Sequence, residues 1–442
     1  MNGKADRAIE RKISRLAAGE APRVLDLFAG CGGFSTGFDR EGFKVLGGVE
    51  IDTHAHRTYR RNHRLHPESP ARLDGPADVT SVDGVSLGGD EAYDVLVGGP
   101  PCQAYARVGR AKLREVAGAE GAHLRDDRSS LHEQYLRLVR DLRPVVIVIE
   151  NVPDILNQSG VNVGAVVAAN LEAEGYRVRY TVLNAAEYGV PQYRHRFFLI
   201  AWHTLAGVEP TFPPPTHRVE DLPRGYEQER AVSMRLVEAR GCRYYVPAPK
   251  SEASTPAVTC EDAIGDLVSL PAYDPDRPRR TGPGSWLGGG PDAASRPVGY
   301  RGPAGSAFAA AMRTGTDHDG KTTGHQTRYL PRDWGTFARM SEGDQYPEAL
   351  EIARARLEEW RRARPDPEAP ISDQDVARFV PPYDAGKFPN KWRKLERDRP
   401  ARTLLAHLGH DSYTHIHYDA VQARTITVRE AARLQSFPDD FR

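Results

Sequence analysis

Cysteine is scarce in this sequence, and neither sign of charge is in excess. The four cysteines, Cys31, Cys102, Cys242 and Cys260, are scattered through 442 residues and form no Cys-x-x-Cys pair. Their spacing predicts neither a metal site nor a disulfide framework, and reduced thiols of a cytosolic protein are the simplest account. Lys plus Arg and Asp plus Glu each total 60, so the formal net charge is zero. Uniform basicity is excluded, and any surface for nucleic acid must be a local patch.

Long apolar runs are also absent. The longest, such as residues 145–149, have the length of a β-strand and not of a membrane span. Residues 1–20 are charged and lack the apolar stretch of a signal peptide. We therefore expect a cytoplasmic protein that does not engage membranes. The chain is long enough to bury a substantial core and to form two domains.

The first half of the chain alternates short β-branched runs with helix-like stretches. Patterns of buried strands occur at 23–28, 43–50, 94–97, 145–149, 177–182 and 196–201. Helical patterns lie between them, for example at 130–140 and 163–174. Strands that alternate with helices predict an α/β fold with a mostly parallel sheet that is covered on both faces.

The pattern changes after Trp202. Residues 203–394 have little α/β rhythm, although 347–364 form a charged helical stretch. Aromatic residues such as Trp334 and Trp360 supply core material there, so we expect a separate, loop-rich domain rather than a disordered insertion. Helical patterning returns at 427–435, where Thr427 and Glu430 have the spacing of a capping box.

A glycine-rich turn joins the first strand to a helix in the segment Asp26-Leu27-Phe28-Ala29-Gly30-Cys31-Gly32-Gly33-Phe34. Glycines let the backbone approach a ligand where a Cβ atom would clash. The spacing is not Gly-x-Gly-x-x-Gly, which disfavours a dinucleotide site. Glu50 ends the next strand, where an acid can accept both hydroxyls of a ribose, and Asp78 could contact an adenine amino group. Together they predict a nucleoside site; a ligand-free turn is the alternative.

Cys102 follows the third strand in the segment Gly98-Gly99-Pro100-Pro101-Cys102-Gln103. A cysteine at the carboxyl end of a parallel strand points into the crevice where such sheets bind ligands. The two prolines fix the backbone before it, and a deprotonated thiol is a strong nucleophile. A free cysteine is more often buried in packing, but the flanking Gly-Pro-Pro and Gln favour a nucleophile here.

Charged residues follow two further strands. Glu150 comes directly after the run 145–149 and is expected at the same sheet edge as Cys102. A carboxyl group beside a ligand there can be kept protonated and then donates a hydrogen bond; a helix cap is the alternative. In Gln192-Tyr193-Arg194-His195-Arg196, strand alternation would place Gln192, Arg194 and Arg196 on one face. Two guanidinium groups on one face suit an oxyanion, whereas a solvated edge strand is the alternative.

In this order, the motifs resemble those of the DNA cytosine-5 methyltransferase family of bacterial type. The matching segments are VLDLFAGCGGFSTGF, GVEID, DVLVGGPPCQ, ENV, YGVPQYRHRFFLIA, RPARTL and TVREAARLQSFPDDF. They extend from Val24 to Phe441, with a dissimilar region between the fifth and sixth segments. The resemblance implies a Rossmann-like fold that uses S-adenosyl-L-methionine, together with a smaller target-recognition domain.

The resemblance also implies a mechanism on duplex DNA. The target cytosine is flipped out of the helix, because its reacting carbon atoms are unreachable in the stack. Cys102 attacks C6, Glu150 contacts N3 and the amino group, and Arg194 lies near O2 with support from Arg196. Carbon C5 then takes the methyl group, its proton is lost, and Cys102 leaves.

Further contacts follow from the same resemblance. The cofactor is expected against Phe28, Ala29, Gly30, Cys31, Gly32, Gly33, Glu50, Ile51, Asp78, Val79 and Pro101. DNA is expected to contact Gln103, Arg107, Arg110 and Gln192, the first three in a mobile loop that closes over the duplex. The expected domains are 1–202 for catalysis, 203–394 for target recognition and 395–442 for the return to the catalytic domain. The family normally continues beyond Phe-Pro-Asp-Asp-Phe, so we expect the usual C-terminal end to be absent here or supplied elsewhere.

The favoured interpretation is therefore a monomeric bacterial enzyme that methylates double-stranded DNA in a restriction-modification or other phage-defence setting, with restriction or defence proteins as cognate partners. One alternative is the branch of the family that acts on a tRNA cytosine, although the large middle region favours DNA. Another is a regulatory or split DNA-binding subunit that needs a partner. The presence of Cys102, Glu150, Arg194 and Arg196 favours an enzyme.

Overall fold

The computed structural model contains two compact units, each built from more than one stretch of chain. It describes residues 2–64, 66–70, 73, 75–101, 131–158, 160–220, 222, 226–272, 286–287, 296–315, 320–382, 384, 387, 391–405 and 413–442. Unit 1 comprises residues 1–184, 195–215 and 220–252, and unit 2 comprises 185–194, 216–219 and 253–442.

Unit 1 is built on a six-stranded sheet with the order β2-β1-β3-β4-β6-β5. The strands are β1 Arg23–Leu27, β2 Lys44–Val49, β3 Val95–Gly98, β4 Val146–Asn151, β5 Tyr176–Asn184 and β6 His195–His203. Strands β2, β1, β3 and β4 are parallel, whereas β6 runs antiparallel to both β4 and β5. The predicted α/β fold with a mostly parallel sheet is confirmed, as are all six predicted strands.

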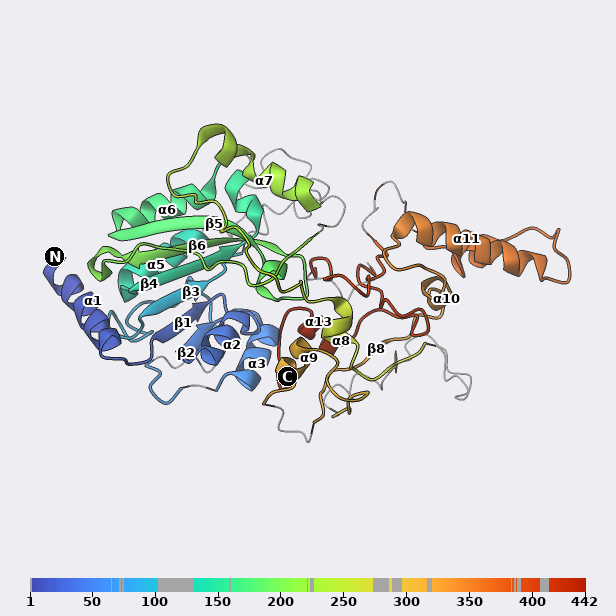
Figure 1. Cartoon of the computed structure of the whole chain (residues 1–442), viewed down its shortest axis with the longest axis horizontal. Helices are drawn as coiled ribbons and strands as arrows, with labels where there is room; N and C mark the ends of the chain where they lie inside the picture. The colour runs from blue at the N-terminus through green and yellow to red at the C-terminus, as the bar shows by residue number, and fades with distance from the viewer. Residues whose placement is uncertain are drawn as a thin grey trace. The chain divides into compact units, whose positions relative to one another are not determined.

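Helices cover both faces of this sheet, as Figure 1 shows. The helical segments of unit 1 are α1 Asn2–Ala17, α2 Gly33–Arg40, α3 Thr53–Asn62, α5 Leu131–Leu142, η3 Pro153–Asn157, α6 Val163–Ala173, η5 Thr204–Ala206 and α7 Tyr226–Arg240. Val24, Val95 and Val97 pack against Phe34 and Phe38 of α2 on one face. The alternating residues of the same strands, such as Leu25 and Leu96, join the core formed with α5 and α6 on the other face. Apolar residues on both faces are typical of parallel strands.

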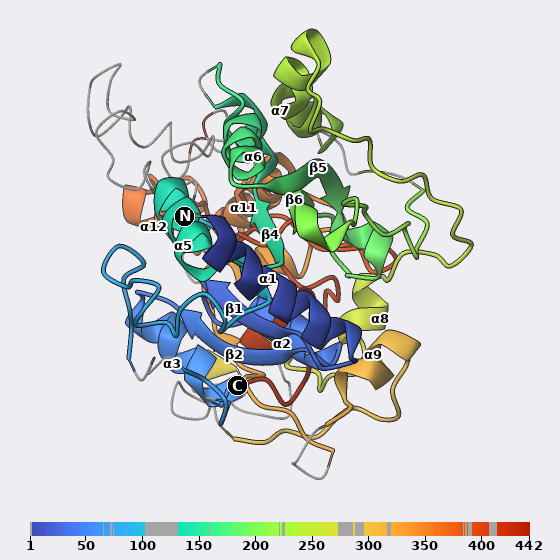
Figure 2. The same ribbon diagram turned by 90° about the vertical axis from the view of Figure 1, so that its left-hand side faces the viewer.

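Helix α1 lies at the amino-terminal edge of the sheet, in front of the strands in Figure 2. Lys12 is buried, and its Nζ atom donates to the carbonyl oxygens of Leu142 at 3.0 Å and Arg143 at 2.8 Å. Arg15 forms an ion pair with Asp94, which is also buried. These contacts attach α1 to the edge opposite the one where the nucleoside site is predicted.

Unit 2 consists mainly of loops and short helices. Its elements are η4 Ala185–Tyr188, α8 Cys260–Ile264, β7 Trp286–Leu287, α9 Ala307–Met312, β8 Thr327–Arg328, α10 Trp334–Phe337, α11 Tyr346–Arg362, α12 Asp373–Ala377 and α13 Val428–Arg433. Phe337, Tyr346 and Trp392 form an aromatic core. The predicted helices at 347–364 and 427–435 are confirmed as α11 and α13, and Thr427 and Glu430 form the predicted capping box.

The compact units do not coincide with the expected domain limits. The segment 220–252 packs with the sheet, because Met234, Val237 and Tyr244 belong to its core. Residues 395–442 fall in unit 2, because Leu395, Leu404 and Leu434 share a core with α8. The assignment of catalysis and target recognition to 1–202, 203–394 and 395–442 stays a prediction.

Candidate active site

The glycine-rich turn lies at the carboxyl edge of the sheet, between β1 and α2. Phe28, Gly30 and Gly32 have φ angles of 58°, 57° and 99°, the left-handed region. A Cβ atom on Gly32 would lie 2.5 Å from Nε2 of His63, so His63 would have to move, and the φ angle of Gly32 also disfavours any other residue. At Gly30 no atom of the described residues, apart from its chain neighbours, lies within 4 Å of a built Cβ position. The turn is thus packed on one side and open on the other, where a ligand could approach its backbone.

Glu50 fixes this turn from the neighbouring strand. Its Oε2 atom accepts a hydrogen bond from the Gly30 N–H at 2.8 Å, and its Oε1 atom accepts one from the Asp52 N–H at 2.7 Å. Each carboxylate oxygen has a second lone pair, so the group can still accept hydroxyl donors. Ile51 beside it is 64 % exposed, so its apolar side chain is accessible to a ligand.

The other predicted cofactor contacts divide into open and buried residues. Asp78 is half-buried, and its Oδ1 atom accepts a hydrogen bond from the Thr80 N–H at 2.9 Å. Pro101 and Cys31 are also half-buried. The side chains of Ala29 and Val79 are buried, and Val79 belongs to the core of unit 1. The Val79 side chain therefore does not suit the cofactor contact that we expected for it.

Glu150 lies next to the segment that leads to Cys102. It belongs to β4 itself and does not follow the strand. A Cβ atom on Gly99 would lie 3.1 Å from Oε2 of Glu150, and Asn151 donates to the Pro100 carbonyl at 2.8 Å. Cys102, Gln103, Arg107 and Arg110 lie outside the described residues. The structure thus places the predicted carboxyl group against the backbone three residues before the predicted nucleophile.

Arg196 holds the Glu150 carboxyl group. The Nε atom of Arg196 lies 2.8 Å from Oε1 of Glu150, and the two side chains are 15 % and 25 % exposed. Because β4 and β6 are antiparallel neighbours, Glu150 pairs with Phe198 in register and Arg196 lies two residues away on the same strand. The predicted catalytic residues Glu150 and Arg196 are thus brought together in unit 1.

Gln192 and Arg194 belong to unit 2 and Arg196 belongs to unit 1, so the common face predicted for the three residues stays a prediction. Within unit 2, Arg194 Nη1 donates to Gln192 Oε1 at 3.4 Å. Strand β6 begins only at His195. Gln192 is fully buried; its Nε2 atom donates to the Leu434 carbonyl at 2.9 Å, and its Oε1 atom accepts from the Leu404 N–H at 3.0 Å. The buried amide of Gln192 already bonds to backbone groups through its nitrogen and its oxygen, so it does not suit the DNA contact that we expected for it. Arg194 Nη1 lies 3.4 Å from the Leu404 carbonyl oxygen.

The sequence of this chain is similar to those of known DNA methylases. The family model for C-5 cytosine-specific DNA methylases matches residues 22–244. A protein of Oceanobacillus iheyensis that is assigned as type II methyltransferase M.OihORF3336P is 38 % identical over 428 residues, which cover 95 % of this chain and 89 % of that protein. The type II methyltransferase M.AgeI of Thalassovita gelatinovora is 30 % identical over 455 residues, covering 95 % and 92 %.

The chain belongs to the C-5 cytosine-specific DNA methylase family. A crystal structure assigned to a prophage-encoded DNA modification methyltransferase from E. coli shares the fold with a TM-score of 0.54 and 20 % identity, covering 96 % of this chain and 90 % of the other. The resemblance drawn from the sequence motifs is confirmed. In this methylase, the family match ends close to the point where the chain leaves unit 1 at residue 252.

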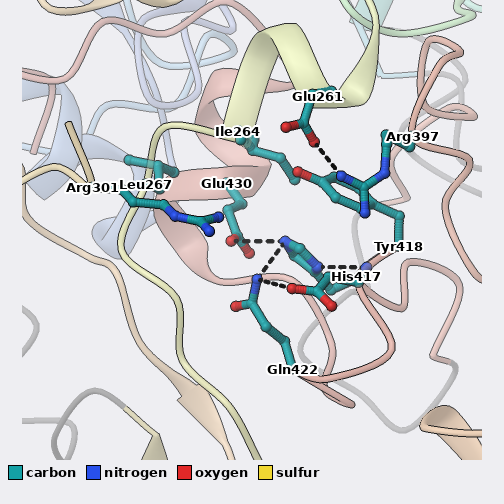
Figure 3. A pocket seen from close by; sticks show the side chains of 11 residues that line it. Glu261, Ile264, Leu267, Arg301, Arg397, His417, Tyr418, Gln422 and Glu430 are labelled. Atoms are coloured by element: carbon teal, nitrogen blue, oxygen red, sulfur yellow. Dashed lines mark hydrogen bonds and ion pairs between the residues drawn. The ribbon is translucent and has the colours of Figure 1, made fainter. Parts of the chain in front are cut away.

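Unit 2 of the methylase contains a small polar hollow, shown in Figure 3. Its volume is about 20 Å³, room for about one water molecule. Several of its polar groups are paired with one another: Arg397 donates to Glu261 at 3.3 Å, and Gln422 donates to Asp419 at 3.3 Å. Its size and internal pairing favour a structural role over ligand binding.

Two polar residues of the methylase's sheet edge belong to the predicted motifs but were given no role from the sequence. Asp26 is a buried carboxyl group directly below the glycine-rich turn, and Asn151 bonds to the Pro100 carbonyl. The signal for Asp26 was a charged residue inside the apolar strand Arg23–Leu27.

The described residues contain no cluster of three or more His, Cys, Asp or Glu side chains that could hold a metal ion. Among the helices of the described segments, none has the length and apolar character needed to span a bilayer.

Proposed function

We propose that this protein transfers a methyl group from S-adenosyl-L-methionine to C5 of cytosine in double-stranded DNA. The observation that carries the proposal is the position of Glu150, held by Arg196 at 2.8 Å and lying against Gly99, three residues before Cys102. A nucleophile and a carboxyl group at one sheet edge, beside an open glycine turn, suit covalent catalysis on a bound base. Membership of the methylase family supports the same reaction.

The residues around the turn fit the methyl donor. Among the described residues, nothing beyond its chain neighbours lies against a Cβ position built on Gly30. The Glu50 carboxyl group has lone pairs for ribose hydroxyls, and Asp78 is available for the adenine amino group. Phe28 and the exposed Ile51 offer apolar surface for the adenine ring. When bound, S-adenosyl-L-methionine would supply an electrophilic methyl group.

The chain's own residues would then act on a flipped-out cytosine. The Cys102 thiolate would attack C6, and Glu150 would bind N3 and the amino group and carry the proton that neutralises the ring. Arg194 would hold O2, and Arg196 would keep Glu150 in place. Loss of the C5 proton would allow Cys102 to leave. Base flipping costs a few kcal/mol, which contacts to the extruded base must offset.

Residues of unit 2 are proposed to recognise the DNA sequence. Arginine, lysine, asparagine and glutamine side chains read base edges in the major groove, and each good bidentate contact contributes roughly 1–3 kcal/mol of discrimination. The names of the type II relatives support a place in a restriction-modification system, with a cognate nuclease as a partner.

The test is bisulfite sequencing of DNA from cells that express the protein. The wild-type protein should protect cytosines in one recurring sequence, and Cys102→Ala should abolish this protection while binding to DNA survives. Cys242→Ser is the matched control, because Cys242 contacts Tyr180 on the outermost strand β5, and this variant should leave methylation intact. Normal methylation by Cys102→Ala would show that the proposed mechanism is wrong.

A further inference from the structure

Asp26 is a fully buried carboxyl group that the proposed mechanism does not use. It lies on β1, two residues before Phe28, and is 1 % exposed. Its Oδ2 atom accepts hydrogen bonds from the Ser35 N–H at 3.2 Å and the Ser35 hydroxyl group at 2.8 Å. Ser35 belongs to the first turn of α2, so Asp26 joins the strand that enters the glycine-rich turn to the helix that leaves it.

This carboxyl group has no ion-pair partner among the described residues. Its second oxygen, Oδ1, is buried and has no hydrogen-bond partner there. The titratable groups that interact with Asp26 are Glu50 from the end of β2, Tyr59 from α3, Cys31 from the turn and Tyr135 from α5. All four are acids, and none can carry a positive charge. A buried carboxylate without a cation is costly, so the group is poised to take up a proton or to receive a positive charge.

Burial and the nearby Glu50 determine the ionisation of this group. Burial, with a smaller contribution from Glu50, outweighs the hydrogen bonds from Ser35 and raises the pKa of Asp26 to about 7. Near neutral pH, Asp26 is therefore divided between its protonated and ionised forms. A positive charge that arrived at the same turn would favour the ionised form.

We propose that Asp26 is the buried charge that selects the positively charged methyl donor over its uncharged product, and that donor binding expels a proton from this carboxyl group. The inference rests on the proposed function, in which the turn binds S-adenosyl-L-methionine. The donor carries a sulfonium charge, whereas S-adenosylhomocysteine has a neutral thioether at the same position. By linkage, a cation that favours ionised Asp26 binds more tightly when Asp26 is ionised.

This proton makes the affinity for the donor depend on pH. Below pH 7 the free protein holds a proton on Asp26, which donor binding must displace, so donor affinity falls as the pH falls. Above about pH 8 the carboxyl group is ionised with or without donor, and the affinity no longer depends on it. Each unit by which the donor lowers the Asp26 pKa changes the affinity by about tenfold across this range. The product should show little of this dependence.

The test is isothermal titration calorimetry of the full chain with each ligand, in buffers of different ionisation enthalpy, between about pH 6 and pH 8.5. The two ligands share their adenosine and amino-acid groups, so titration of those groups cancels in the comparison. Donor binding should release more protons than product binding, with the excess largest near pH 6 to 7 and absent at the alkaline end. Equal proton release for the two ligands would overturn the inference, and this comparison needs no variant.

Asp26→Asn gives a second measurement. The amide oxygen can still accept from Ser35, but the residue cannot be charged. In this variant the excess proton release should disappear, and the preference for donor over product should fall. Asp39→Asn is the matched control, because Asp39 is an exposed acid of the same helix α2. An excess that persisted in Asp26→Asn would assign it to another group. Failure of either ligand to bind would overturn the proposed function as well, whereas binding with equal proton release would overturn this inference alone.

Discussion

The ion pair between Arg196 and Glu150 is the contact on which the predicted active site depends most. A charge-assisted hydrogen bond of 2.8 Å between half-buried side chains fixes the direction of the carboxyl group. Glu150 is thereby kept against the backbone that leads to Cys102. Arg196 thus positions Glu150 through this ion pair, and this role needs no contact between Arg196 and the substrate.

We predict that Arg196→Gln slows methylation by roughly 10²–10⁴-fold, the usual contribution of a positioned proton-transfer group. The affinity for S-adenosyl-L-methionine should remain, because the glycine-rich turn and Glu50 are untouched. Glu150→Gln should also slow the reaction while leaving Cys102 able to form an adduct. Single-turnover methylation and cofactor titration measure the two effects separately.

Arg179→Gln is the control for Arg196→Gln. Arg179 lies on the neighbouring strand β5, is 37 % exposed and has an ion pair with Glu209 at 4.0 Å. Exposed pairs of this kind contribute little, so the variant should methylate at the wild-type rate. A wild-type rate in Arg196→Gln would contradict the role given to the Arg196–Glu150 pair.

The sequence predicted the positions of some single residues better than those of others. The position of Glu150 could be predicted, because an acid at the end of an apolar strand must lie at the sheet edge. Gln192 could not, because its burial depends on backbone groups of Leu404 and Leu434, more than 200 positions away. No role could be predicted for Asp26, because the strand pattern accounts only for its neighbours Leu25 and Leu27, and the contact between Asp26 and Ser35 is seen only in the fold.

At the scale of elements, α13 is held by a buried ion pair. Glu430 and Arg424 are each 1 % exposed, with 2.7 Å between Oε1 and Nη2. Burial raises the pKa of Glu430, but Arg424 lowers it by more, so the pKa lies well below its usual range. His417 also lies near Glu430; burial lowers the pKa of this histidine to about 3, so it is neutral at pH 7. Arg424 is therefore the charge partner of Glu430.

We predict that Glu430→Gln lowers the free energy of unfolding at pH 7 by about 3–5 kcal/mol, because it leaves Arg424 buried without its partner. A carboxyl pKa that is lowered in the folded state contributes stability above its unfolded value of about 4.3, and this stability is lost as the pH falls toward the folded value. The wild type should therefore lose stability in acid more steeply than the variant.

Urea unfolding followed by tryptophan fluorescence at neutral and acid pH measures this difference. Four of the five tryptophans, Trp286, Trp334, Trp360 and Trp392, lie in unit 2 together with α13. Glu351→Gln on α11 is the control, since Glu351 is exposed. A variant Glu430→Gln with wild-type stability at pH 7 would refute the importance of the pair.

The elements of the sheet could be predicted far better than those of unit 2. In the sequence, β-branched runs between helical stretches predict the strands, and a capping box within four residues predicts the start of α13. Unit 2 instead depends on contacts between distant segments, such as Phe337 with Trp392 and Tyr413. Such contacts leave no local period in the sequence, and short elements such as α8 and α10 were therefore not predicted.

At the scale of the whole molecule, the chain combines a methylase unit with a second, loop-rich unit. The balanced net charge means that DNA affinity must come from local groups and should fall with salt according to the number of phosphates contacted. The family match covers the sheet unit, whereas full-length relatives show that the combination of both parts occurs in type II methyltransferases.

The most direct test of the central claim is covalent trapping on DNA. A duplex with 5-fluorocytosine at the methylated position blocks release of Cys102, because the fluorine at C5 cannot leave as a proton does. The protein should become permanently joined to this duplex in the presence of S-adenosyl-L-methionine, and peptide mapping should locate the link at Cys102. An active preparation that methylates unmodified DNA but never forms the link, or forms it through another residue, would contradict the account.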